Sequence, residues 1–433
     1  MIKSGEAKYL KNLSWMSLEK FVRIFSGVFI GLWVSRYLKP EAYGALSYAL
    51  SVSSLLINLM ALGLESIVVR ELVYQENRRN SIVINALTLR LFSSVIILSL
   101  VLMLSPFFSK DETITLMIFT LTFQGFFHSF FVLDWFFQSQ ARFKFVAISN
   151  IVGLFIGGAL KIYFISVKAS VYYFTLAYLM EASAVAVMLY IYFYRDEHRL
   201  ILKEISTKMS SSLIINSFPL ILASLITLVY MRSDQIMLKW YLGNYDVGIY
   251  SASVRLSQMF YLIPTILGSS FFPAILNAKV VSKKLYYKRL EALFGMSTAL
   301  GIIITILLYV LSDEIIELFY GLDYQQSSAV FRIHVLSTVL VFSGVIASKW
   351  IVAENMQKFF NVILFISMIM NVFLNYFMIP SYGMLGAAYA TFISQLMASL
   401  ILPAIFTKTR RQALMILKSF NSFRTYILLK SLR

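Results

Sequence analysis

The chain has 433 residues, of which 59% are hydrophobic and 14% are charged, and its formal net charge is +17. Soluble domains carry a charge on about a quarter of their residues, so this composition excludes an ordinary soluble domain and indicates a polytopic helical membrane protein. The basic residues are dispersed in short loops between apolar runs, so we do not expect nucleic-acid binding. The absence of cysteine excludes disulfides and thiol chemistry.

Twelve apolar segments are long enough to cross a bilayer, which requires roughly 20 residues each. The first carries Glu19, Lys20 and Arg23 with no clean hydrophobic stretch before them, so we expect a retained span and no cleavable signal peptide. The predicted fold is all-α and integral to the membrane. In chain order the predicted spans are residues 12–34, 41–64, 81–105, 113–137, 145–165, 170–194, 211–238, 247–277, 289–311, 328–350, 359–379 and 384–406.

Lysine and arginine predict the orientation of these spans. One set of connections, together with both termini, holds 26 basic residues, and the opposite set holds five. Cytoplasmic loops are the ones enriched in these residues, so both termini are predicted to be cytoplasmic. The longest connections, residues 195–210 and 312–327, are too short to form a domain outside the membrane.

Seven basic residues fall inside the predicted spans, where each would cost roughly 2.5–3.5 kcal/mol if centred in lipid. Lys161 and Arg332 lie near the outer ends of their spans, where snorkelling to the interface is expected. The others should face a hydrated cavity or a partner. We predict a cationic substrate pathway lined by Lys20, Arg23, Arg90, Arg232 and Arg255.

Two charged pairs leave alternatives open. Glu19 and Arg23 stand four residues apart, so either they neutralise each other near the cytoplasmic interface or Lys20 and Arg23 attract an anionic head group. Arg232 and Asp234 stand two residues apart and point to different sides of a helix, so each needs another partner. They either snorkel towards the outer interface or belong to a central cavity.

Groups suited to enzyme chemistry are few. The three histidines form no metal-ligand spacing, no Walker-type glycine-rich loop is present, and no catalytic Ser/His/Asp or paired-carboxylate set stands on a loop. Enzyme activity is therefore not expected. Asp134, near the inner end of the fourth span, could serve as an ion pair, a head-group contact or a proton site.

Prolines and glycines predict local features of the helices. A proline inside a helix removes a backbone hydrogen bond, so either moving hinges or static kinks are expected at Pro219, Pro264 and Pro273. Small residues four apart allow close packing of helices, which is expected at the pairs Gly27/Gly31 and Gly153/Gly157.

A weak internal repeat suggests two related halves. Residues 37–47 align without a gap on residues 241–251, with a Tyr-Leu pair, a glycine and a serine in register. Movement of one half against the other would give alternating access. We predict two six-helix bundles, residues 1–205 and 206–410, and a basic cytoplasmic tail, residues 411–433. The end of the chain is either an amphipathic helix along the inner leaflet or a mobile polar tail.

Four stretches together resemble the polysaccharide (O-antigen) flippases of bacteria, which belong to the multidrug/oligosaccharidyl-lipid/polysaccharide exporter superfamily. Each motif is weak alone, but their order and spacing over nearly the whole chain are fairly specific. The stretches are residues 12–44 with Trp15 and Arg23, Asp134-Trp135-Phe136-Phe137-Gln138, residues 232–252 from Arg232-Ser233-Asp234-Gln235 to Gly248-Ile249-Tyr250-Ser251, and residues 379–391 with Gly386-Ala387-Ala388.

The resemblance implies two six-helix bundles around a central, largely cationic cavity. It implies an undecaprenyl-pyrophosphate-linked oligosaccharide as cargo, moved to the outer leaflet of the bacterial inner membrane for O-antigen or other surface polysaccharide synthesis. Membrane lipids and the polymerase of the same pathway are the implied partners. No cofactor is implied, and coupling to a proton or sodium gradient would have Asp134 and Asp234 as candidate carriers.

Three alternatives are weighed against this interpretation. An exporter of amphipathic drugs should have an acidic cavity, yet the spans hold only four carboxylates against seven basic residues. A lipid II flippase remains open, because its cargo has the same charge. A membrane-embedded O-antigen polymerase would need a sizeable polar outer loop, and the 312–327 connection is short and has no arginine.

Overall fold

The computed structural model describes residues 2–108, 110–196 and 200–421 and is all-helical over them. Within this part of the chain, ten helices are long and apolar enough to cross a membrane. The chain folds into two compact units, residues 1–228 and residues 229–433. The division falls inside a single helix, α9 (Thr207–Tyr241).

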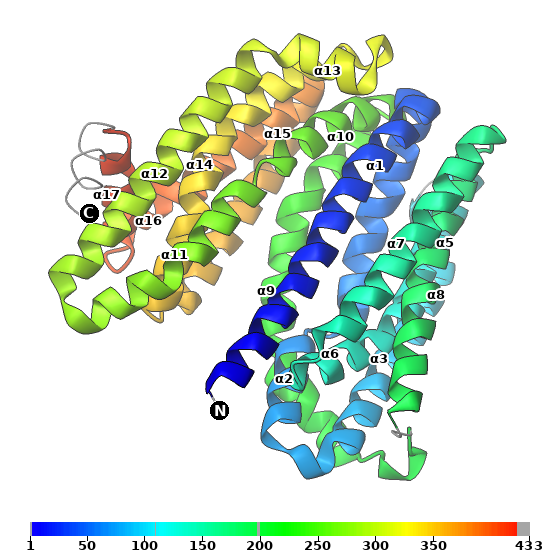
Figure 1. Ribbon diagram of the computed structural model, residues 1–433. Coiled ribbons are helices and arrows are strands. Elements are labelled where there is room, and N and C mark those ends of the chain that lie inside the picture. The colour runs from blue at the N-terminus through cyan, green and yellow to red at the C-terminus, as the bar shows by residue number, and fades with distance from the viewer. Residues whose placement is uncertain (1, 109, 197–199, 422–433) are drawn as a thin grey trace. The chain divides into compact units, whose positions relative to one another are not determined.

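The first unit begins with α1, which has an internal break. A straight helix of its 60 residues would be about 90 Å long, three times the thickness of the hydrocarbon core. Lys39 has φ 59° and ψ 171°, directly before Pro40, and the chain turns back there (Figure 1). The unit comprises α1 (Ile2–Ala61), α2 (Glu65–Tyr74), α3 (Arg79–Met103), α4 (Ser105–Phe108), α5 (Glu112–His128), α6 (Val132–Ser139), α7 (Phe143–Ser166), α8 (Val171–Arg195), the start of α9 (Thr207–Tyr241) and 3-10 turns at Glu76–Arg78, Ser129–Phe131 and Leu202–Glu204.

The second unit has a comparable break in α15. Gly383 takes φ 61° and ψ −143°, a backbone conformation that favours glycine, and it divides α15 into two arms. The unit comprises the end of α9, α10 (Asn244–Met259), α11 (Leu262–Val281), α12 (Lys283–Val310), α13 (Ser312–Tyr320), α14 (Ser327–Ala353), α15 (Gln357–Leu396), a π-helical turn (Met397–Ile401), α16 (Leu402–Ile405), α17 (Arg410–Ser419) and a 3-10 turn at Leu322–Tyr324.

The two breaks account for the predicted number of spans. The breaks divide two of the ten helical stretches, Ser14–Tyr74 and Gln357–Ile405, so these ten stretches supply twelve segments over the described residues. The predicted all-α membrane fold is confirmed. The end of the chain is helical as far as Ser419, where α17 packs on α12 and the hydroxyls of Ser419 and Thr298 lie 2.7 Å apart. The remainder of the predicted tail, residues 422–433, lies outside the described residues.

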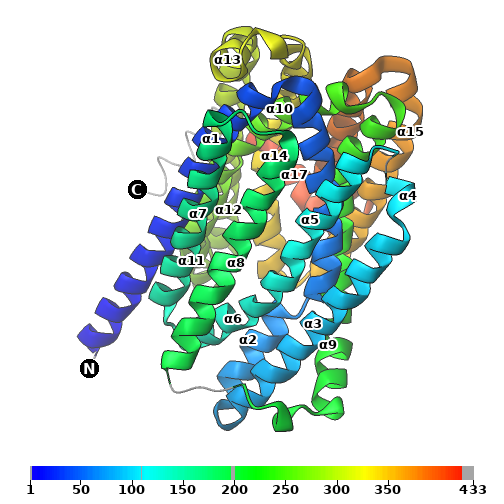
Figure 2. The same ribbon diagram turned by 90° about the vertical axis from the view of Figure 1, so that its right-hand side faces the viewer.

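Glycine allows α7 and α8 to approach closely in the first unit (Figure 2). A Cβ atom at Gly153 would lie 2.4 Å from a methyl group of Val185 and 2.9 Å from the backbone oxygen of Glu181. A Cβ at Gly157 would meet the Glu181 side chain at 2.6 Å. The predicted packing role of this pair is confirmed. The same prediction is wrong for Gly27, because a Cβ there would meet nothing within 4 Å.

This contrast predicts different stabilities for two matched variants. Gly153→Leu forces a side chain into the α7–α8 interface, and overpacking of this kind costs about 1–3 kcal/mol. We expect a clearly lower melting temperature in detergent for Gly153→Leu and an unchanged one for Gly27→Leu, measured by thermal unfolding of the purified proteins. Equal melting temperatures would contradict the packing role of Gly153.

Candidate functional site

A buried carboxylate organises the interior of the second unit. Asp234 lies on α9, and its side chain is 6% exposed. The hydroxyl of Tyr250, on α10, donates to it at 2.5 Å. The Asn375 amide and the Thr391 hydroxyl, on the two arms of α15, donate at 2.6 and 2.5 Å. All three donors are neutral. Because they lie on α10 and α15, helices α9, α10 and α15 meet at one carboxyl group.

Further polar side chains extend this cluster. The Tyr250 hydroxyl also lies 3.3 Å from Nε2 of His334 on α14, and Nδ1 of His334 lies 3.4 Å from the Ser257 hydroxyl. Asn371, one turn before Asn375, accepts a hydrogen bond from Ser233 at 2.7 Å. The cluster is a connected, buried, oxygen-rich network of the kind that can hold a proton or a hard cation.

The sequence singled out Asp234 as a candidate, but it assigned no role to the partners that the structure places around it. Asn375 and Thr391 stand 141 and 157 residues further along the chain. One signal was available: Asn371 and Asn375 are amides four residues apart in an apolar span, and polar residues inside spans usually serve a function.

The two arginines predicted for the second unit have different surroundings. Arg232, half-buried on α9, lies 3.5 Å from the side-chain oxygen of Gln235. The Gln235 amide in turn donates to Ser251 at 3.0 Å. Arg255 is half-buried on α10. Neither side chain is among the hydrogen-bond donors to Asp234 described above.

Arg90 is the most deeply buried cation of the predicted pathway. It lies on α3, is 3% exposed, and its guanidinium carbon stands 5.0 Å from the centre of the Trp135 ring on α6. Its Nε has no hydrogen-bond partner within the described residues. Asp134, next to that tryptophan, accepts a hydrogen bond from Gln138 at 2.8 Å. Arg90 and Trp135 therefore form one cationic-aromatic cluster inside the first unit.

Arg23 forms the ion pair that its sequence spacing allows, and it also faces a cavity. It pairs with Glu19 at 2.6 Å, as expected for residues four apart. Half of its side chain remains exposed, and it lines a polar cavity of about 180 Å³ with Gln124, Asn150 and other side chains of the first unit. Lys20 is exposed on the same helix.

Lys161 and Arg332, both expected to snorkel, each pair with an acidic side chain. Lys161 was expected to snorkel, but its ammonium group lies 3.4 Å from Glu181 and 3.7 Å from the centre of the Tyr178 ring. Its acidic partner on a neighbouring helix makes snorkelling unnecessary, which spacing within one helix could not reveal. Arg332 pairs with Asp313 at the start of α13, beyond the end of its span.

The three predicted hinges occupy different helical positions. Pro219 and Pro273 lie inside α9 and α11. Pro264 is the third residue of α11, in the first turn, where backbone N–H groups have no partner within the helix. Pro264 therefore removes no intrahelical hydrogen bond, whereas Pro219 and Pro273 each do.

The chain is similar to transporters of lipid-linked glycans and of drugs. It is 27% identical over 183 residues to the probable flippase AglR of Haloferax volcanii, a match that covers 40% of this chain and 37% of AglR. The chain thus matches less than half of that relative's length. Its fold is shared with the lipid II flippase MurJ in an inward closed conformation, with a TM-score of 0.72 and 16% identity over 97% of this chain and 95% of MurJ.

The fold is also similar to that of a multidrug resistance transporter of the MATE family in its inward-facing conformation. Its TM-score is 0.70 at 14% identity, over 97% of this chain and 99% of that protein. Two family sequence patterns match the chain, over different lengths. The MatE pattern matches residues 219–377, and the pattern of the polysaccharide biosynthesis proteins matches residues 9–279, more than half of the chain. The chain belongs to the polysaccharide biosynthesis protein family.

Proposed function

We propose that the protein moves a lipid-linked oligosaccharide repeat unit across the bacterial inner membrane, from the cytoplasmic to the outer leaflet. The family match over residues 9–279 carries this proposal. The name of the relative AglR, a probable flippase, and the fold shared with MurJ support it. The carrier is undecaprenyl pyrophosphate, and the product is used for O-antigen or another surface polysaccharide. Both termini are cytoplasmic, and the polymerase of the same pathway receives the unit.

The charge of the cargo explains the basic residues of the spans. A pyrophosphate that leaves water for a low-dielectric interior costs several kcal/mol unless opposite charge compensates it. The proposed pathway supplies that charge while the lipid tail stays in the bilayer, and alternating access exposes the pathway to each side in turn. Its residues are Lys20, Arg23, Arg90, Arg232 and Arg255.

Asp234 is the proposed site of ion coupling. A buried carboxylate is costly as a bare anion, so binding a proton or a sodium ion stabilises it. The Tyr250 and Thr391 hydroxyls beside it carry oxygen atoms of the kind that a hard cation prefers, whereas Asn375 faces the carboxylate with its amide N–H. Asp134 is the second candidate, with Gln138 as its partner. Pro219 and Pro273 are the proposed hinges.

The proposal is tested in a host that lacks the gene. Radiolabelled lipid-linked repeat units should accumulate on the cytoplasmic leaflet, and surface polymer should be lost. Units that reach the outer leaflet but stay unpolymerised would point to an enzyme instead. Normal units with normal surface polymer would contradict the proposal and favour a drug exporter.

A further inference from the structure

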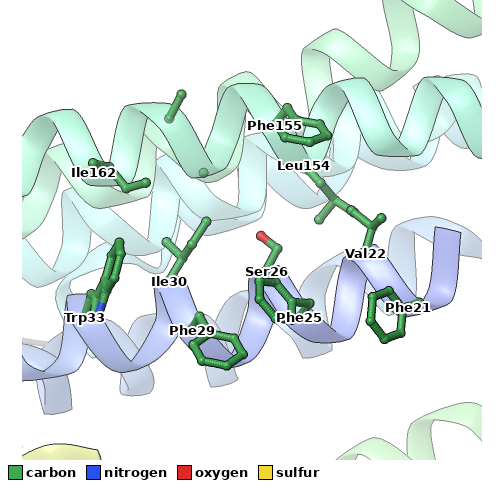
Figure 3. Close-up of a pocket in the computed structure, with 12 residues that line it drawn as sticks. Phe21, Val22, Phe25, Ser26, Phe29, Ile30, Trp33, Leu154, Phe155 and Ile162 are labelled. Atoms are coloured by element: carbon green, nitrogen blue, oxygen red, sulfur yellow. The ribbon is translucent and has the colours of Figure 1, made fainter. Parts of the chain in front are cut away.

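An elongated apolar groove of about 460 Å³ lies between α1 and α7 in the first unit (Figure 3). It extends on α1 from Phe21 to Trp33 and on α7 from Leu154 to Ile162. Twelve residues of helix correspond to about 18 Å. Both walls belong to the same compact unit, so the groove is a feature of this bundle alone.

Four aromatic rings form one rim of the groove. Phe21, Phe25, Phe29 and Trp33 recur every fourth residue on α1, and each is 46–66% exposed. The ring centres of Phe21 and Phe25 lie 6.3 Å apart, and those of Phe25 and Phe29 lie 4.3 Å apart. Phe25 and Phe29 thus pack against each other, and Phe21 lies next to Phe25.

A glycine on α7 lets α1 approach closely along one side of the groove. Val22, Ser26 and Ile30 point from α1 towards α7 (Figure 3). A Cβ atom at Gly158, on the facing part of α7, would lie 2.7 Å from the terminal methyl of Ile30. Glycine at this position lets the helices approach, and the adjacent Ala159 is exposed in the groove.

The groove is cationic beyond one end. Lys144, the second residue of α7, has its ammonium group 6.0 Å from the centre of the Trp15 ring on α1. Trp15 precedes Phe21 by six residues, or about 9 Å of helix. Lys20 is exposed near the same end. The positive-inside rule predicts that this end is cytoplasmic. A ligand that matches the groove has a long hydrocarbon chain and an anionic head.

We propose that the α1–α7 groove binds the polyprenyl chain of the carrier lipid, with the phosphate of the carrier near Lys144. This inference rests on the proposed function for the identity of the ligand. A polyprenyl chain presents double bonds and methyl branches along its whole length, and the row of ring faces matches that repeating surface. A saturated acyl chain offers no such repeat.

Photolabelling of the purified full chain in phosphatidylethanolamine/phosphatidylglycerol vesicles tests this. The probe is a polyprenyl phosphate with a diazirine on its chain. We expect label on residues 21–33 and 154–162, reduced about tenfold by excess polyprenyl phosphate but not by the same excess of dioleoyl phosphatidate, which has the same head group. Equal competition by phosphatidate would overturn the proposal in favour of an ordinary acyl lipid.

Two tryptophan variants of α7 locate the site. Ala159→Trp fills the groove from an exposed position and should lower labelling about tenfold. Ile156→Trp adds the same ring at an exposed position of α7 that does not line the groove, and should leave labelling unchanged. Labelling that is insensitive to Ala159→Trp would overturn the proposal. If that variant fails to fold, the competition experiment on the unmodified protein tests whether the groove binds the polyprenyl chain.

The probe carries no sugar, and the assay requires no transport. Specific labelling of a protein whose loss leaves the repeat units on their normal leaflet would therefore overturn the proposed function but leave the groove as a polyprenyl site. Flipping that depends on the protein, without specific labelling, would overturn the groove as a polyprenyl site but leave the proposed function standing.

Discussion

Replacing Arg90 with methionine is expected to lower surface polysaccharide at least about tenfold, which corresponds to 1.4 kcal/mol, without lowering the stability of the protein. Arg90 is 3% exposed, and its Nε has no hydrogen-bond partner within the described residues. A buried donor without a partner costs about 1–3 kcal/mol, which offsets the contribution of the guanidinium stacked over Trp135, so we expect its loss to change stability little. A cation kept at such a cost is expected to serve the cargo.

Two further variants separate charge from shape. Arg90→Lys keeps the charge but loses the planar guanidinium that lies over Trp135, and should retain partial activity. Arg332→Met is the matched control, because that arginine pairs with Asp313 beyond the end of its span and should leave polymer levels near normal. Surface polymer is measured against the amount of protein in the membrane. Normal polymer with Arg90→Met, or a large fall in melting temperature, would contradict a role of Arg90 in the pathway.

Asp234→Asn is expected to abolish transport that depends on an ion gradient. The amide has almost the same size as the carboxyl group but carries no charge, so it can neither bind a proton nor balance a sodium ion. An ion at 100 times its dissociation constant stabilises a folded protein by about 2.7 kcal/mol. We therefore expect the melting temperature of the unmodified protein to rise by several degrees when the coupling ion is added, and this rise to be absent in Asp234→Asn.

The same measurement identifies the ion. A response to sodium at constant pH indicates sodium, whereas a response to pH alone indicates the proton. Asp134→Asn tests the second candidate carboxylate, and Asp323→Asn, in the exposed turn after α13, is the control. Loss of the response in Asp134→Asn but not in Asp234→Asn would transfer the coupling role to the first unit.

The sequence predicts the helices better than their contacts. Apolar length alone located twelve spans, and the connection predicted between residues 34 and 41 contains the break at Lys39. Side-chain partners depend on which helices meet. The Lys161–Glu181 pair and the donors to Asp234 join segments that only the folded chain brings together. Gly27 and Gly153 have the same spacing to a second glycine, yet only Gly153 faces another helix closely.

The proposed function is the movement of a lipid-linked glycan between leaflets. Its most direct test uses the purified protein in liposomes that contain an undecaprenyl-pyrophosphate-linked oligosaccharide, with an ion gradient across the membrane. The fraction of glycan accessible to an added glycosidase is followed over time. We predict that protected glycan becomes accessible with the unmodified protein but not with Arg90→Met. Accessibility that does not change when the unmodified protein is present would contradict the account.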